Sequence, residues 1–317
     1  MVTVYHNRIV TDEDIRRVID AAQVLIPNDR EVLHILPQEF IVDDQDGVQN
    51  PLGMAAARLE VNVHIVTGSV TSAQNIIKCC NQSGLDVEDI VLEPLSSSQA
   101  VLSPDEQEVG VVLVDIGGGT TDVTIYSEGS IVHTAVLALG GNHLTHDIAI
   151  GLGAPLHEAE GIKHNFGVAM TSMVEENEMI EVPSVGGRNN RTMKKRVLAS
   201  IIEDRFREIF ELISHEIEKT HFHTLMASGV VITGGTCIMP GADQLASQVL
   251  NLPVRVGFPE NISGLREMIY SPKYATSVGL VRYGITSNQG KLHFAGDDTN
   301  LFNKVSRRMK DWMQNFF

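Results

Sequence analysis

The sequence VLVDIGGGTTDVTIY, residues 112–126, contains the strongest structural signal in the chain. An apolar run ends at Asp115, and three glycines and two threonines then precede Asp122 and a second run of β-type residues. A carboxylate at the end of a buried strand lies where open sheets bind their ligands. Glycines let backbone amides approach an anion closely, and threonines add hydroxyl donors. The pattern predicts a hairpin, with strands at residues 109–115 and 121–126, whose turn binds phosphate.

The turn residues and the first carboxylate are assigned separate roles. A carboxylate beside bound phosphate most economically serves a divalent cation, and Mg²⁺ keeps several of its waters. Asp115 is therefore the candidate magnesium ligand, acting through a water shell. The alternative is a bare hairpin end, but tight hairpins prefer Asn-Gly or Asp-Gly pairs and need no paired Thr. The candidate phosphate contacts are Gly117, Gly118, Gly119, Thr120 and Thr121.

A second glycine segment, VVITGGTCIMPG at residues 230–241, contains a strand, a Gly-Gly pair, a short spacer and a Pro-Gly pair that opens a helix. Glycines at a strand end allow a flat ring or a sugar to pack on the backbone. Alone this signal is weak, because many α/β loops share it. Together with the hairpin it supplies the two sides needed to hold one nucleotide.

Composition limits the classes of protein and of partner. The 317 residues are 43% hydrophobic and 20% charged, which is typical of a globular chain, and the length favours two domains. The net charge of −16 argues against nucleic acid as a partner, because that binding needs clustered Lys and Arg. Cys79, Cys80 and Cys237 lack metal or disulfide spacing and suit a reducing compartment. With no signal-peptide pattern and no window of ~18 apolar residues, we expect a cytosolic chain.

The remaining sequence alternates helical and strand patterns. Thr11 and the acids after it predict a capped helix, and alternation at Leu59, Val61 and Val63 predicts a half-buried strand. Gly84 is expected to end the next helix, and Asn142 to precede a later one. The other expected strands are residues 31–44, 89–95 and 129–139, and the other expected helices are residues 96–102, 197–220 and 271–285, with a linker from residue 286.

Both glycine segments resemble motifs of the actin, Hsp70 and sugar kinase superfamily. The hairpin resembles its second phosphate motif, and residues 234–241 resemble its adenosine motif. Residues 34–68, HILPQEFIVDDQDGVQNPLGMAAARLEVNVHIVTG, resemble the subdomain inserted in FtsA-type bacterial cell-division proteins, and residues 274–284, YATSVGLVRYG, are also similar to that family. The resemblance implies an α/β, actin-like (ribonuclease H-like) two-lobed ATPase fold with an inserted α+β subdomain.

The resemblance also implies a division into subdomains. In chain order these are the insertion (1–66), the remainder of the first actin-like subdomain (67–131), the second actin-like subdomain (132–167 and 229–270), the outer subdomain (168–228), a closing helix that returns to the first subdomain (271–286), a linker (287–300) and a C-terminal helix (301–317).

Carried over position by position, the family's nucleotide site implies ATP and Mg²⁺ as cofactors. Gly234, Gly235 and Thr236 would face the adenosine. In AEGIK, residues 159–163, Glu160 would bond the ribose hydroxyls and Lys163 would lie near the base. A solvent-facing ion pair explains the same spacing equally well.

The segment EPLSSSQAVL, residues 93–102, resembles the helix from which this superfamily positions a hydrolytic water. The candidate catalytic residues are Glu93, expected at a strand end, and Gln99. A Glu that caps the helix and a Gln on the protein surface would account for these two residues equally well. Any ATPase activity is expected to be slow and regulatory. The superfamily's first phosphate motif, an Asp-x-Gly hairpin, should precede the insertion, yet the first such turn is at Asp115. We therefore expect an incomplete first lobe and a weakened affinity for nucleotide.

The C-terminal residues 301–317 combine an apolar helical face with a basic rim, after a polar linker. This pattern is typical of a helix that lies in a membrane interface, and FtsA-type proteins end in this way. A helix that docks on the protein body or in a partner's groove is the alternative. The apolar positions are Leu301, Phe302, Val305, Met309, Trp312, Met313 and Phe316, and the basic ones are Lys304, Arg307, Arg308 and Lys310.

By resemblance, the expected function is that of an actin-like scaffold on the cytoplasmic face of the inner membrane at the division septum. Its expected partners are FtsZ, through the FtsZ C-terminal tail, further copies of itself in filaments, anionic lipids and downstream division proteins. Two alternatives stay open at this point: an FtsA-like platform of pilus or secretion machines, and a soluble kinase or phosphohydrolase of the same superfamily.

Overall fold

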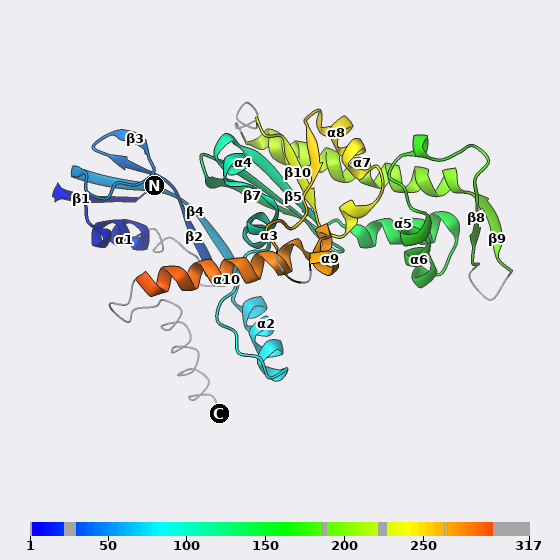
Figure 1. Cartoon of the computed structure of the whole chain (residues 1–317), viewed down its shortest axis with the longest axis horizontal. Helices are drawn as coiled ribbons and strands as arrows, with labels where there is room; N and C mark the ends of the chain where they lie inside the picture. Colours follow the sequence, from blue (N-terminus) through cyan, green and yellow to red (C-terminus); the bar gives the residue numbers. More distant parts are fainter. Residues whose placement is uncertain are drawn as a thin grey trace.

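The computed structural model describes residues 2–21, 30–184, 189–220, 227–262, 264 and 266–293. Sheets of four, five and two strands follow one another along the long axis of the molecule, and helices pack on them or connect them (Figure 1). The five-stranded sheet lies in the middle and carries the residues of the candidate site.

The four-stranded sheet and one helix form the N-terminal unit. Helix α1 (Asp12–Ala21) begins as predicted, because the backbone N–H and the hydroxyl of Thr11 both donate to the Asp14 carboxylate, at 3.0 and 2.7 Å. Alternation along the sheet buries Leu59 and Val61 against Val18 of the helix. The strands, all antiparallel in the order β1-β4-β2-β3, are β1 (Val2–Ile9), β2 (Arg30–Val42), β3 (Gln45–Val48) and β4 (Ala55–Ser69).

The five-stranded sheet has the order β11-β10-β5-β6-β7. Strands β5, β6 and β7 form an antiparallel meander, whereas β10 is parallel to both β5 and β11. At its β7 edge, Gln38 Nε2 of β2 donates to the Ile131 carbonyl at 2.9 Å, and His64 Nε2 of β4 lies 3.0 Å from Thr134 Oγ1. The bounds are β5 (Val111–Ile116), β6 (Thr121–Ser127), β7 (Ser130–Leu137), β10 (Val230–Thr233) and β11 (Val254–Val256).

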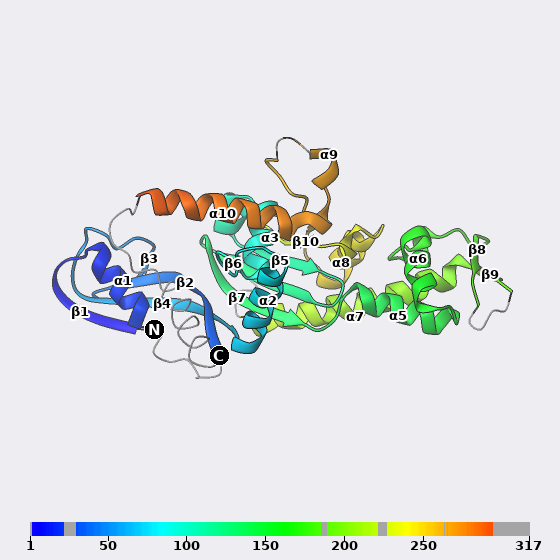
Figure 2. The same ribbon diagram turned by 90° about the horizontal axis from the view of Figure 1, so that it is seen from below.

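Helices cover both faces of this sheet, so the central strands β5 and β10 are buried along their whole length and almost entirely apolar (Figure 2). Val112 and Val114 of β5 face the core shared with α5, α7 and α8, while Val111 and Leu113 face α3 and α10. The covering helices are α3 (Glu93–Val101), α4 (Pro104–Val109), α5 (Gly141–Leu152), α7 (Lys195–Lys219), α8 (Ala242–Leu250) and α10 (Ala275–His293).

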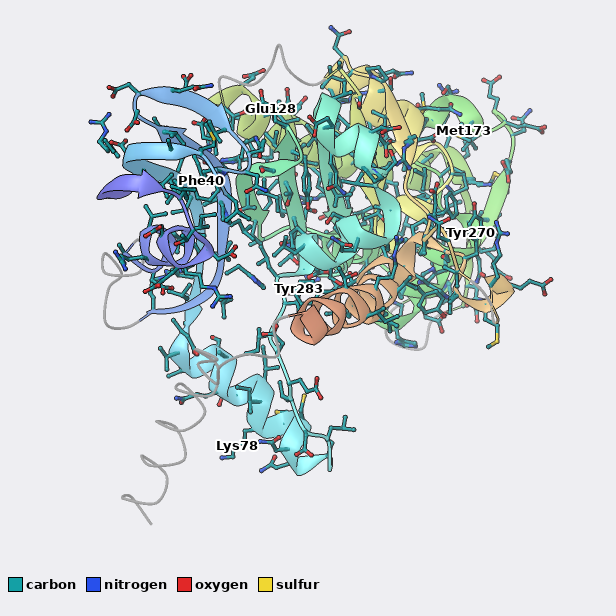
Figure 3. All side chains as sticks on the ribbon, turned by 60° about the vertical axis from the view of Figure 1, so that its left-hand side comes forward. Phe40, Lys78, Glu128, Met173, Tyr270 and Tyr283 are labelled. Atoms are coloured by element: carbon teal, nitrogen blue, oxygen red, sulfur yellow. The ribbon has the colours of Figure 1, made fainter. Side chains whose placement is uncertain are left out.

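The remaining elements lie beyond the two sides of the sheet. Helix α2 (Val70–Gln82), which carries Lys78, extends away from the body, and Gly84 at φ +77° follows its end as predicted (Figure 3). The outer lobe at the opposite end contains α6 (Leu156–Phe166), η2 (Thr171–Met173), β8 (Met179–Val182) and β9 (Arg191–Lys194). Short helices η4 (Thr236–Ile238), α9 (Arg266–Ile269) and η5 (Pro272–Tyr274) complete the described chain.

Several local predictions are wrong. Residues 89–92 form no strand, and α3 begins directly at Glu93 because Pro94 suits the first turn of a helix. The first hairpin strand begins at Val111 rather than at residue 109, since a capping box of Ser103 and Glu106 forms helix α4 just before it. Asn142 lies inside the first turn of α5, after the N-cap Gly140.

Two predicted boundaries are also wrong. A division at residue 131 would separate β5 and β6 from β10, yet all three belong to one sheet, because β5 pairs with both β6 and β10. Helix α10 continues through residue 286 to His293, into the predicted linker, because a helix already packed against α3 adds further turns at little cost even through polar residues. The rest of that linker and the predicted C-terminal helix, residues 294–317, lie outside the described residues.

Candidate functional site

The hairpin turn, residues 117–120, is bonded to the start of helix α5. The Gly141 N–H donates to the Gly117 carbonyl at 2.9 Å, and the Asn142 N–H donates to the Gly118 carbonyl at 2.7 Å. Helix N-termini have N–H groups without intrahelical partners, and here two of them are satisfied by the turn. A Cβ on Gly140 would lie 2.7 Å from the Gly117 oxygen, so this close approach requires glycine.

The second glycine segment joins the same place. Strand β10 lies beside β5 with Thr233 opposite Asp115, and Thr236 Oγ1 donates to the Gly117 carbonyl at 2.9 Å. Gly234 has φ +91°, and a Cβ there would lie 2.5 Å from Asp115 Oδ1. The structure therefore brings the two predicted glycine segments together, with the start of α5 as a third component.

A cavity of about 620 Å³ opens beside this junction. That volume is within the usual range for small-molecule sites. Five predicted residues line it: Gly118, Glu160, Lys163, Gly235 and Thr236. The other lining residues are Gly141, Asn142, His164, Gly167, Ile238, Met239, Pro240 and Lys273.

Lys163 and Glu160 form one wall of the cavity. The Lys163 ammonium, 8% exposed, donates to the Gly141 carbonyl at 3.1 Å, to Thr145 Oγ1 at 2.8 Å and to Glu160 Oε2 at 2.8 Å. Burial raises the pKa of Glu160, but hydrogen bonds from Lys163 and Thr145 outweigh it and hold the pKa below its ordinary value. The pair is therefore an ion pair, as the spacing suggests, but it faces the cavity instead of open solvent.

The hairpin turn offers unused hydrogen-bond donors. In the described part of the chain, the backbone N–H groups of Gly118, Gly119 and Thr120 donate to no protein acceptor. All three residues are exposed, and an added Cβ on Gly119 would meet nothing within 4 Å. Successive free amides in a glycine turn form an anion-binding concavity, so the turn fits a phosphate group.

Three carboxylates lie behind the turn. Burial, then the charges of Glu93 and Asp122, raise the pKa of Asp115 to about 7, against hydrogen bonds from Ser97 and Thr276. Burial and the charge of Glu93 raise the pKa of Asp122 to about 6. Among residues that the structure describes, no group of three or more His, Cys, Asp or Glu side chains has the arrangement of a metal site. A cation here would keep most of its waters, which fits Mg²⁺.

Comparison with known proteins identifies the family. Residues 112–279, more than half of the chain, match the family described as "Cell division protein FtsA", and residues 1–67 match "SHS2 domain inserted in FTSA". The chain belongs to the FtsA family of cell-division proteins. The cell division protein FtsA of Pseudomonas aeruginosa is 43% identical over 317 residues, which cover 98% of this chain and 76% of that protein.

Solved structures show that this member of the FtsA family has the actin-like fold. MreB5 of Spiroplasma citri bound to ADP aligns with a TM-score of 0.57 and 19% identity, over 70% of this chain and 68% of that one. The PilM–PilN type IV pilus biogenesis complex aligns with a TM-score of 0.60 and 14% identity, over 90% and 77%. At these identities the likeness concerns the fold alone.

Some predicted site residues lie away from the cavity. Thr121 is fully buried and its hydroxyl donates to the Leu139 carbonyl at 2.8 Å, so its prediction as a phosphate contact is wrong. Asp115, Gly117, Gly119, Thr120 and Gly234 surround the junction without lining the cavity. No helix in the described ranges is long and apolar enough to cross a bilayer, and every residue predicted to contact membrane lies outside those ranges.

The two candidate water-positioning residues differ in their surroundings. Glu93 starts α3 instead of ending a strand, and Thr276 Oγ1 lies 3.4 Å from both Glu93 Oε1 and Asp115 Oδ2. Gln99 is half-buried on α3, it does not line the cavity, and within the described residues no hydrogen bond or ion pair joins it to the carboxylates. Glu93 thus belongs to the carboxylate group, whereas Gln99 remains a prediction.

Sequence reasoning missed several FtsA-family cavity residues. Asn142 directly follows the pair Gly140-Gly141, a local glycine signal that could have been used. Lys273 reaches the cavity from η5, and its Cβ would lie 3.7 Å from a Cβ on Gly235. No sequence pattern marks Lys273, because only the return of the chain beside β10 brings it there.

Proposed function

We propose that this FtsA-family chain binds ATP with Mg²⁺ in the 620 Å³ cavity and serves as a membrane-bound scaffold of the division septum. The observation that carries the nucleotide part is the junction of hairpin turn, α5 start and second glycine segment, with three free backbone donors beside the cavity. Preformed donors bind phosphate without reorganisation.

Each part of the cavity suits one part of a nucleotide. Beside the cavity, the turn amides of Gly118, Gly119 and Thr120 would hold phosphate oxygens, and Lys273, which lines the cavity, would add positive charge. Glu160, ionised at neutral pH, would accept from the ribose hydroxyls, and Lys163 keeps it oriented. Gly235, Thr236 and the apolar Met239 would face the adenosine. Asp115 would orient a water of the magnesium shell, and Mg²⁺ would supply neutralisation of phosphate charge.

Family membership supports the scaffold role. We propose that residues 301–317 hold the chain on anionic lipid at the cytoplasmic face of the membrane, and that the chain forms filaments, binds the C-terminal tail of FtsZ and recruits later division proteins. The apolar and basic pattern of residues 301–317 supports the lipid contact. A kinase or a pilus platform is disfavoured, since both family matches are to division proteins.

Calorimetric titration with MgATP tests the nucleotide site. Gly235→Val should fold normally, because Gly235 has φ −64° and a Cβ there makes only ordinary contacts, but its side chain should enter the cavity. We expect at least a tenfold weaker affinity, about 1.4 kcal/mol or more. The matched control is Gly161→Val on α6, where an added Cβ meets nothing and the residue does not line the cavity. Equal affinities in all three chains would remove the cavity from the proposal.

Flotation with anionic vesicles tests the scaffold's membrane contact. The intact chain should float, while a chain ending at His293, which keeps all of α10, and the double variant Trp312→Glu, Phe316→Glu should not. If all three float alike, residues 301–317 do not bind the membrane.

A further inference from the structure

The Glu160 carboxylate in the cavity wall has two oxygens with different partners. Oε2 accepts from the buried Lys163 ammonium at 2.8 Å and from the Thr145 hydroxyl. Oε1 lies 2.9 Å from Nε2 of His164, which also lines the cavity. Oε2 is therefore fixed to the protein interior, whereas Oε1 has the His164 ring as its one protein partner within the described residues.

The His164 side chain is loosely held. It is 70% exposed, and the contact with Glu160 is its one hydrogen bond or ion pair in the described part of the chain. The two residues are four apart on α6, and a pair of this kind on an exposed helix surface adds little stability. The imidazole can therefore leave Glu160 by a change of rotamer at small cost.

The charge in the cavity depends on pH through His164. Histidine is the side-chain type whose charge ordinarily changes between about pH 5 and pH 8. Burial raises the pKa of Glu160, but its hydrogen bonds hold that pKa below the ordinary value, so Glu160 stays ionised in this range. The other charged residues among the described cavity residues are Lys163, bonded to three acceptors, and Lys273, whose Nζ lies 4.8 Å from the centre of the Tyr274 ring. The titratable residues of α5, which packs against α6, do not line the cavity: His143, His146 and Asp147.

We propose that His164 sets how strongly the cavity selects ribose: it holds Glu160 Oε1 when protonated, and when neutral it releases that oxygen to the 2′- and 3′-hydroxyls of a nucleotide. This inference deepens the proposed nucleotide function and rests on its ribose contact. An imidazolium is a stronger donor to a carboxylate than a neutral imidazole, so the ribose competes less well for Oε1 at low pH. His164 acts through Glu160 and is a positioning residue.

Calorimetric titration with MgATP at about pH 5.5 and about pH 8 tests this role. The unchanged chain is compared with His164→Gln, which is neutral at both pH values, and with His164→Lys, which is charged at both. At the lower pH, His164→Gln should bind about two- to fivefold more tightly than the other two chains, the range expected from breaking an exposed ion pair. At the higher pH, His164→Lys should bind more weakly than the other two by about the same factor.

Comparison of the chains at one pH isolates His164 from other groups that titrate in this range. The pKa of Asp115 and that of Asp122 are raised, mainly by burial, to about 7 and about 6, but both carboxylates lie behind the hairpin turn and are the same in every chain. The matched control is His157→Gln, also on α6, because His157 Nε2 lies 3.4 Å from Glu158 Oε1 and the residue does not line the cavity. The control should bind like the unchanged chain at both pH values.

Titration with 2′,3′-dideoxy-ATP, which lacks both hydroxyls, tests whether the effect passes through the ribose. All chains should bind this nucleotide equally at each pH. Differences between the His164 variants that persist with it would overturn the inference. So would tighter MgATP binding by His164→Lys than by His164→Gln, which would show that the side chain at residue 164 attracts phosphate, or equal MgATP binding by all chains at both pH values. In each of these cases the nucleotide site itself stands, whereas a failure of every chain to bind MgATP would refute the proposed nucleotide function and this inference with it.

Discussion

Replacement of Asp115 by Asn should stabilise the folded chain at alkaline pH. The carboxyl is 3% exposed and faces the charges of Glu93 and Asp122, so its pKa rises from 3.8 to about 7 on folding. Well below pH 3.8 the group is protonated in both states and costs nothing. Between about pH 4 and pH 7 the unfolded state has lost this proton while the folded state holds it, so stability falls across that range and levels off above about pH 7. The ionised group costs about 4 kcal/mol at pH 8 and about 1 kcal/mol at pH 4.5.

Urea unfolding followed by far-ultraviolet circular dichroism, without nucleotide or metal, measures this effect. The free energy of unfolding of Asp115→Asn should exceed that of the unchanged chain by up to about 4 kcal/mol at pH 8, and by about 1 kcal/mol at pH 4.5. Asp204→Asn, at an exposed position of α7, is the control and should change stability by less than about 0.5 kcal/mol at both pH values. A gain that is the same at both pH values, or a loss at pH 8, would refute the assigned burial and repulsion.

Two further predictions concern packing around the site. Thr121→Val removes the hydroxyl that donates to the Leu139 carbonyl, and it should lower the free energy of unfolding by about 1 kcal/mol. Its affinity for MgATP in calorimetry should be unchanged. A weakened affinity would show that Thr121 contacts the nucleotide after all. Gly279→Ala should cost about 3 kcal/mol, because its Cβ would overlap the Ser96 carbonyl and push α3 from α10. Gly284→Ala, on the open side of the same helix, should be neutral or stabilising by up to about 1 kcal/mol in urea unfolding, and equal losses from both would contradict the packing.

Local sequence could predict those parts of the site where the backbone passes so close to another group that only glycine fits. The hairpin turn and the second glycine segment stand out because their backbones must approach one another or an anion, and the structure joins them through Thr236 and Gly117. The start of α5 and Lys273 come to the junction only through packing of the sheet, which no short pattern records. At residues 89–95, by contrast, the local pattern predicts a strand that the folded chain does not form. An apolar run there precedes Pro94, and the chain uses it to lead into a helix that is anchored by the Leu92 N–H bond to His34 Nε2 at 2.9 Å.

The bonds from β2 and β4 to β7 also limit how copies of this chain can assemble. An open edge strand invites a strand from another molecule, and such pairing leads to uncontrolled aggregation. Here Gln38 and His64 occupy polar groups along β7, and β11 at the other edge is only three residues long. The central sheet therefore has β2 and β4 against its β7 edge and offers only a short template at its β11 edge. In the filaments proposed above, copies of this chain would therefore meet through side-chain surfaces rather than through paired strands, and such contacts can be reversible.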